Sequence, residues 1–203
     1  MDLIELTIDG ISIQAESGTS VLEAARQAGI RIPTLCHLAD LTPEGACRLC
    51  VVKIDGMRTL TAACVQPVAA GMVVHTHTSE VLEARRTVLE LLLANHPTDC
   101  LACVRNLDCE LQTLAAELGA SRPHFAGQQR HYARDDGNAF IVRDNEKCIL
   151  CGRCVRVCQE LQVCNVLGFM NRGFETKLGP AFDTPTHESD CVFCGACVSA
   201  CPV

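Results

Sequence analysis

Residues 148–158 read CILCGRCVRVC, and residues 191–201 repeat the same spacing as CVFCGACVSAC. Each run places four cysteines at C-x2-C-x2-C-x3-C, and Pro202 follows the second run. A C-x2-C-x2-C loop can wrap three thiolates around a cubane iron–sulfur cluster, whose fourth ligand then comes from elsewhere in the chain. The repeat therefore predicts two 4Fe–4S sites.

The duplication itself indicates how the fourth ligands are shared. In two-cluster ferredoxins the last cysteine of each run ligates the other cluster. Zinc sites are the alternative, but they use two C-x2-C pairs rather than this run twice. The predicted ligand sets are Cys148, Cys151, Cys154 with Cys201, and Cys191, Cys194, Cys197 with Cys158.

A second group of cysteines lies near the beginning of the chain, at C-x10-C-x2-C-x13-C: Cys36, Cys47, Cys50 and Cys64. Plant-type 2Fe–2S ferredoxins use C-x4-C-x2-C with a distant fourth cysteine, so the short pair matches and the first gap is longer. A zinc site with four cysteines is the competing interpretation. We expect a 2Fe–2S centre here.

A third group has only three cysteines and one histidine, at H-x3-C-x2-C-x5-C: His96, Cys100, Cys103 and Cys109. Imidazole can replace thiolate on iron, and the replacement raises the reduction potential. On spacing alone a zinc site with three cysteines and one histidine competes with a 4Fe–4S cluster. Of the sixteen cysteines, these four sets leave only Cys164, which the apolar stretch LQVCNVLGF predicts to be a buried core thiol.

The rest of the pattern predicts an α+β fold. LIELTI and ISIQA flank Asp9-Gly10 as a hairpin, and VLEAARQAG reads as a helix. Further strands are expected at VVKI, MRTLTAAC and VVHTHT, and a helix that Ser79 caps follows. We expect a β-grasp 2Fe–2S ferredoxin domain, a small helical His-ligated 4Fe–4S domain with a linker at 120–138, and a bacterial two-cluster 4Fe–4S ferredoxin domain, over residues 1–78, 79–138 and 139–203.

Composition narrows the class of protein. The formal charge of −7 argues against a nucleic-acid partner. No secretory leader is visible, and the longest apolar-rich piece, VLELLLA, is too short to span a bilayer. We therefore expect a cytoplasmic protein without direct membrane insertion, in which cysteines at this spacing are cluster ligands rather than disulfides. No phosphate-binding glycine loop and no catalytic Ser/His/Asp set occurs, so we expect no catalytic residue and no NAD or flavin site.

Three arginines lie among the cysteine loops: Arg48, Arg153 and Arg156. Their charge would favour a reduced, more negative cluster. Solvated loop arginines are the alternative interpretation.

The ordered set of motifs resembles the N-terminal iron–sulfur region of iron-only (FeFe) hydrogenases, NAD-linked formate dehydrogenase catalytic subunits and the large iron–sulfur subunit of respiratory complex I. The resemblance covers essentially the whole chain and rests on IPTLCHL, GACRLCVV, NHPTDCLACVRNLDCELQ and DNEKCILCGRCVRVCQE. The complete second run, DCVFCGACVSACP, and NVLGFMNRGFET look more like the hydrogenase and formate dehydrogenase branch.

This resemblance implies one 2Fe–2S cluster and three 4Fe–4S clusters, the third of them held by His96 and its three cysteines. It also implies an electron relay between a flavin-containing NAD(P)H-oxidising subunit, with a small 2Fe–2S subunit, and a catalytic hydrogenase or formate dehydrogenase subunit. Members of the first two groups continue into a large catalytic domain. We therefore expect either a separate electron-transfer subunit or the front part of a catalytic chain, with a complex I-like iron–sulfur subunit as a further alternative.

Overall fold

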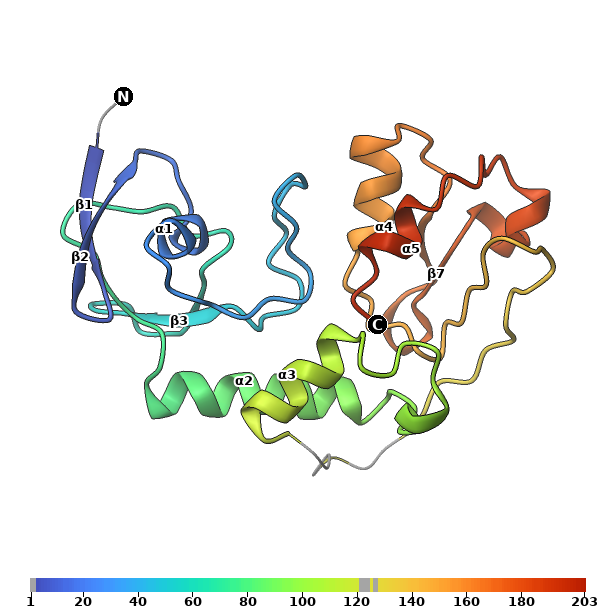
Figure 1. The fold of residues 1–203 in the computed structure, drawn as a ribbon, viewed down its shortest axis with the longest axis horizontal. Helices are drawn as coiled ribbons and strands as arrows, with labels where there is room; N and C mark the ends of the chain where they lie inside the picture. Colours follow the sequence, from blue (N-terminus) through green and yellow to red (C-terminus); the bar gives the residue numbers. More distant parts are fainter. Residues whose placement is uncertain (1–2, 121–124, 126–127) are drawn as a thin grey trace. The chain divides into compact units, whose positions relative to one another are not determined.

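The computed structural model describes residues 3–120, 125 and 128–203. The chain divides into two compact units, and each is described by itself. The first unit comprises Met1–His37, Pro43–Leu89 and Leu114–Ser121; the second comprises Leu38–Thr42, Glu90–Thr113 and Arg122–Val203. Figure 1 shows the elements of both units along the chain.

The first unit is built on a hairpin. Strand β1 (Leu3–Ile8) pairs antiparallel with β2 (Ile11–Glu16), and the register ends at Ile8 opposite Ile11. Asp9 and Gly10 both adopt positive φ, 48° and 83°, as a two-residue type I′ turn requires. The predicted hairpin is confirmed.

Three further strands complete a five-stranded sheet in the order β2-β1-β5-β3-β4. They are β3 (Val51–Ile54), β4 (Thr61–Ala62) and β5 (Val73–His75). Strand β5 runs parallel to β1 and antiparallel to β3. The sequence pattern predicts a strand through residue 78, but β5 ends at His75 because the Thr76 N–H donates to the Asp9 carboxylate at 2.7 Å instead of continuing the ladder.

Helix α1 (Val21–Gln27) supplies one side of the core of this unit. Ser20 caps it by accepting a hydrogen bond from the Glu23 N–H at 3.2 Å. Its buried residues join apolar side chains of the sheet in one cluster, which also contains Cys50 and Cys64. The core of the sheet domain thus reaches two of the predicted ligands.

Two helices cross the boundary between the units: α2 (Ser79–Leu93) and α3 (Glu110–Leu118). The prediction that Ser79 caps α2 is wrong. The Thr78 hydroxyl accepts from the Val81 N–H at 3.2 Å, because the cap lies one residue before the first helical residue. None of the described helices is both long and apolar enough to cross a membrane.

The second unit contains short elements around the cysteine runs. Helix α4 (Arg153–Arg156) continues into a π-helical turn, η2 (Val157–Leu161), and α5 (Ala196–Ala200) follows the second run. Strands β6 (Gly168–Met170) and β7 (Lys177–Gly179) form a two-stranded sheet. Single 3-10 turns complete the described part of the unit: η1 (Cys100–Ala102), η3 (Gly173–Glu175), η4 (Ala181–Asp183) and η5 (Thr186–Glu188).

The α+β class is confirmed, whereas the three module boundaries stay predictions. The predicted linker at 120–138 lies partly outside the described residues, at 121–124 and 126–127. Its described end is packed rather than free. Arg130 donates to the carbonyls of Cys148 and Thr176, and Asp135 pairs with Arg143 through two backbone hydrogen bonds of 2.9 and 3.0 Å.

Candidate metal centres

The first predicted set lies in the loops of the sheet domain. Cys36, Cys50 and Cys64 are buried and Cys47 is half-buried. The thiols form two pairs: Cys50 Sγ lies 3.4 Å from Cys64 Sγ, and the Cys47 N–H donates to Cys36 Sγ at 3.4 Å. The structure thus brings together all four cysteines that the spacing selects.

The backbone of this loop is shaped for a close approach. Arg48, between Cys47 and the buried Leu49, adopts a left-handed φ of 58°. The Ala63 N–H donates to the Cys50 carbonyl at 3.1 Å, which places Cys64 beside Cys50. Arg48 itself is exposed, as the solvated interpretation of this arginine expects.

Proton sharing within each pair dominates the electrostatics of this set. The hydrogen bond between the two thiols lowers the pKa of Cys47 and, together with burial, raises that of Cys36. In the same way the pKa of Cys50 is lowered and that of Cys64 raised. Metal ligation requires thiolates, so a bound metal would replace the proton that each pair now shares.

The second set, around His96, lies in the second unit. Cys100 begins the turn η1, Cys109 precedes α3, and all three thiols are half-buried. The Gln112 N–H donates to Cys109 Sγ at 3.5 Å, and Lys147 Nζ donates to Cys103 Sγ at 3.7 Å.

His96 has the state that a metal ligand needs. Burial, followed by the charge of Lys147, lowers the pKa of its imidazole and favours the neutral ring. Its Nδ1 is buried and has no hydrogen-bond partner among the described residues. A buried acceptor nitrogen without a partner fits a missing metal bond, because buried polar atoms are otherwise nearly always paired.

The two cysteine runs at the end of the chain share one loop geometry. Leu150 and Phe193 have left-handed φ values of 54° and 52°, and the glycines after the second cysteines, Gly152 and Gly195, have φ of 75° and 74°. The N–H groups of Leu150 and Phe193 donate to Cys148 Sγ at 3.4 Å and Cys191 Sγ at 3.5 Å. The sequence repeat is therefore a structural repeat.

The structure also places the fourth cysteine of each run beside the other loop. Burial, together with the nearby Cys201 thiol, raises the pKa values of Cys148, Cys151 and Cys154. Cys158 lies with Cys191 and Cys194 around the Cys164 thiol, whose pKa burial and these three neighbours raise. This is the arrangement that crossed ligation requires.

Cys164 itself differs from the prediction of a buried core thiol, which is wrong. The side chain is half-exposed and donates to the Gln162 carbonyl at 3.3 Å. Left-handed φ values at Val163 and Asn165, 55° and 54°, turn this segment over the surface, and Val163 is 72% exposed. The apolar sequence therefore does not mark a core position here.

Charged residues that spacing alone cannot find lie against the loops. Arg153 and Arg156 are buried rather than solvated: Arg153 binds Glu110, and Arg156 donates to the Thr42 carbonyl at 2.7 Å. Lys147 and Glu110 are further residues that sequence reasoning missed. Their only sequence signal is adjacency to a ligand, since Lys147 precedes Cys148 and Glu110 follows Cys109.

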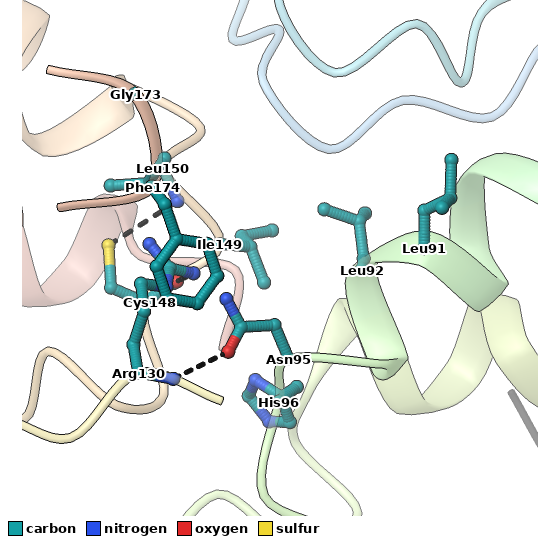
Figure 2. A pocket seen from close by; sticks show the side chains of 10 residues that line it. All are labelled: Leu91, Leu92, Asn95, His96, Arg130, Cys148, Ile149, Leu150, Gly173 and Phe174. Atoms are coloured by element: carbon teal, nitrogen blue, oxygen red, sulfur yellow. Dashed lines mark hydrogen bonds between the residues drawn. The ribbon is translucent and has the colours of Figure 1, made fainter. Parts of the chain in front are cut away.

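A pocket of about 230 Å³ lies between the His96 set and the first cysteine run. Figure 2 shows Leu92 and Asn95 on one side and Phe174 and Cys148 on the other, with the Asn95 side chain accepting from the Arg130 N–H at 2.9 Å. His96 and Cys148 both line it, so ligands of two predicted sites face one hollow.

In the described part of the chain, no three His, Cys, Asp or Glu side chains gather as the ligands of one metal ion would. A cubane cluster holds its four thiolates at separate corners. The fit of these sites to iron–sulfur clusters therefore rests on the loop geometry, the thiol pairs and the unpartnered His96 nitrogen.

Three protein families match successive parts of the chain. Residues 2–79 match the 2Fe–2S iron–sulfur cluster binding domain, residues 85–124 the NADH-ubiquinone oxidoreductase-G iron–sulfur binding region, and residues 147–203 the 4Fe–4S dicluster domain. The solved structure of an NAD+-reducing NiFe hydrogenase in the H2-reduced state covers 88% of this chain and 75% of its own, at 34% identity and a TM-score of 0.82. The chain belongs to this iron–sulfur family.

Relatives known by sequence agree with the membership. Subunit HndD of the NADP-reducing hydrogenase of Solidesulfovibrio fructosivorans is 44% identical over 100% of this chain. An iron–sulfur relative from the NADH-quinone oxidoreductase of Rhizobium meliloti is 39% identical over 99% of it. The chain spans 35% and 23% of the length of these two relatives. Within the family its role is electron transfer through a 2Fe–2S centre and 4Fe–4S clusters.

Proposed function

We propose that the chain relays electrons through one 2Fe–2S and three 4Fe–4S clusters within an NAD(P)-linked oxidoreductase of the hydrogenase type. The observation that carries this proposal is the crossed arrangement of the two cysteine runs. Cys201 lies near the three thiols of the first loop, while Cys158 lies with thiols of the second. Two neighbouring clusters need this arrangement, and isolated zinc sites do not.

The four ligand sets of this proposal are those that the spacing selects. Within the first set, the thiol pairs favour Cys36 with Cys47 on one iron and Cys50 with Cys64 on the other. The unpartnered Nδ1 favours His96 as the ligand that completes the set of Cys100, Cys103 and Cys109.

When bound, iron–sulfur clusters accept and release single electrons. The chain's own residues fix what those electrons meet. Buried Cys36, Cys50 and Cys64 exclude water from the 2Fe–2S loop. The N–H groups of Leu150 and Phe193 donate to ligand sulfurs, and such hydrogen bonds stabilise the more negative, reduced state.

The proposed partners are a flavin-containing subunit that oxidises NAD(P)H, with a small 2Fe–2S subunit, and a catalytic hydrogenase subunit. Complexes named for NAD+ and NADP among the relatives support this choice. A formate dehydrogenase subunit is the less supported alternative. A reducing, cytoplasmic location fits free thiolate ligands.

A second candidate is that these residues are the electron inlet of a longer catalytic chain. The relative HndD favours it, because this chain spans 35% of that subunit. A complex I-like iron–sulfur subunit would have the same consequence for NADH-quinone oxidoreductase relatives.

Native mass spectrometry of the anaerobically purified assembly tests the proposal. We expect about fourteen iron atoms on this chain, with a flavin subunit and a hydrogenase subunit bound. A colourless chain that carries zinc would overturn the proposal. A much longer chain in the source cell would favour the second candidate.

The His96 assignment has its own test. A His96→Cys variant should lower the potential of one 4Fe–4S cluster, because imidazole ligation raises it. Redox titration followed by electron paramagnetic resonance (EPR) measures this. If no cluster shifts, His96 is not a ligand.

A further inference from the structure

Lys147 is placed between two of the proposed clusters, although it is a ligand of neither. Its Nζ donates to Cys103 Sγ at 3.7 Å, a thiol of the His96 set. The next residue, Cys148, belongs to the first cysteine run. One side chain thus meets the His96 set while its backbone leads directly into a ligand of the neighbouring set.

Lys147 also acts on the histidine of the same set. Its backbone makes a hydrogen bond with the His96 ring, and its charge disfavours the protonated imidazole. The side chain therefore helps keep His96 in the neutral form that binds a metal, while the backbone orients the ring.

The charge of Lys147 is only partly compensated. The Asp99 carboxylate lies at a distance, with Oδ2 3.9 Å from Nζ, and its side chain is 54% exposed. The Lys147 side chain is 28% exposed, so water screens it less than it screens Asp99. A cation beside a ligand sulfur stabilises the cluster state that carries the extra electron.

We infer that Lys147 is a positioning and tuning residue that raises the reduction potential of the His96-ligated cluster above that of its neighbour. This inference rests on the proposed function, since it needs a cluster at His96, Cys100, Cys103 and Cys109. Arg153, a second cation near this set, is bound to Glu110 by two short hydrogen bonds, so its charge is neutralised locally. Lys147, in contrast, donates directly to a thiol of the set.

The direct test is redox titration, followed by EPR, of the whole complex carrying Lys147→Met. We expect the equilibrium constant for reducing the His96-ligated cluster to fall about ten-fold, which is about 59 mV for one electron. The other clusters should shift much less. Lys147→Arg keeps the charge and should restore most of the potential, whereas a purely structural role would not be rescued by charge alone.

Two further variants complete the design. Asp99→Asn removes the compensating carboxylate and should shift the same cluster in the opposite direction, even if Lys147→Met assembles poorly. Lys177→Gln is the matched control, because Lys177 pairs with Asp183 and, within the described residues, makes no hydrogen bond to a cysteine.

The outcomes separate the two claims. An unchanged potential in Lys147→Met and in Asp99→Asn, with iron content and the EPR signal intact, would overturn the inference and leave the proposed function standing. A wild-type complex without iron at the His96 set would overturn the ligand assignment instead.

Discussion

The guanidinium of Arg153 donates two hydrogen bonds to the Glu110 carboxylate, at 2.5 and 2.9 Å. Arg153 stands between Cys151 and Cys154, and Glu110 follows Cys109 directly. The ion pair therefore joins the loop of the His96 set to the first cysteine run. The Glu110 N–H also donates to the Pro202 carbonyl at 2.8 Å, one residue after Cys201.

Burial makes this pair asymmetric, which leads to the first prediction. The Arg153 side chain is 4% exposed, whereas that of Glu110 is 47% exposed. Glu110→Gln leaves a buried cation without its counter-charge and should cost about 2 kcal/mol of unfolding free energy. Arg153→Met leaves a carboxylate that water can solvate, so it should cost less. Anaerobic calorimetry of the loaded protein gives the order of the two melting temperatures.

The double variant is the control for this prediction. Once Arg153 is Met, Glu110→Gln should add almost nothing, because its partner is gone. A lower melting temperature for Arg153→Met than for Glu110→Gln would contradict the burial argument.

The second prediction concerns the crossed fourth ligands. With crossing, Cys201 and Cys151 serve one cluster, while Cys194 serves the other. Cys151→Ser/Cys201→Ser should therefore lose about four iron atoms, as Cys151→Ser alone does, whereas Cys194→Ser/Cys201→Ser should lose about eight. Iron and sulfide analysis of anaerobic protein measures both. The reverse order of losses would indicate that each run supplies its own fourth ligand.

The sequence predicts the ligand sets because cluster chemistry fixes cysteine spacing within short loops, and it predicts the hairpin because Asp9-Gly10 suits only a few turns. It does not predict the pairing of Glu110 with Arg153. These residues are 43 positions apart, and only the folded chain brings them together. The Cys164 prediction failed because the left-handed residues on either side of it turn an apolar segment outward.

The third prediction concerns Arg85, the cation buried near the 2Fe–2S loop. Arg85 is 1% exposed and donates to the Val51 carbonyl at 2.8 Å, next to Cys50. Burial lowers its pKa to about 10, so it remains charged at neutral pH. Arg85→Met should lower the 2Fe–2S potential by an amount on the order of 59 mV, a ten-fold change in the reduction equilibrium.

Arg86 provides the matched control for this measurement. It follows Arg85 in α2, but it is exposed and donates to the Leu118 carbonyl at 3.0 Å. Arg86→Met should leave the EPR-monitored potential unchanged. Equal shifts in the two variants would mean that the effect comes from net charge and not from the buried position.

The last prediction uses Cys164, the one cysteine outside the four proposed ligand sets. It is half-exposed, whereas Cys194, a proposed ligand, is more exposed. Accessibility alone would therefore make Cys194 the better target for an alkylating reagent, but iron binding should protect its sulfur. Anaerobic alkylation of the loaded protein at about pH 8.5, where a free thiol is half ionised, should modify Cys164 alone, as peptide mass spectrometry would show.

Two controls accompany this measurement. The Cys164→Ser variant should take up no label, and removal of iron with a chelator should expose the other cysteines to the reagent. Label on Cys194 in protein with full iron content would show that this sulfur is not a ligand. Cys164, which lies near Cys158, Cys191 and Cys194, would then replace it at the second cysteine run.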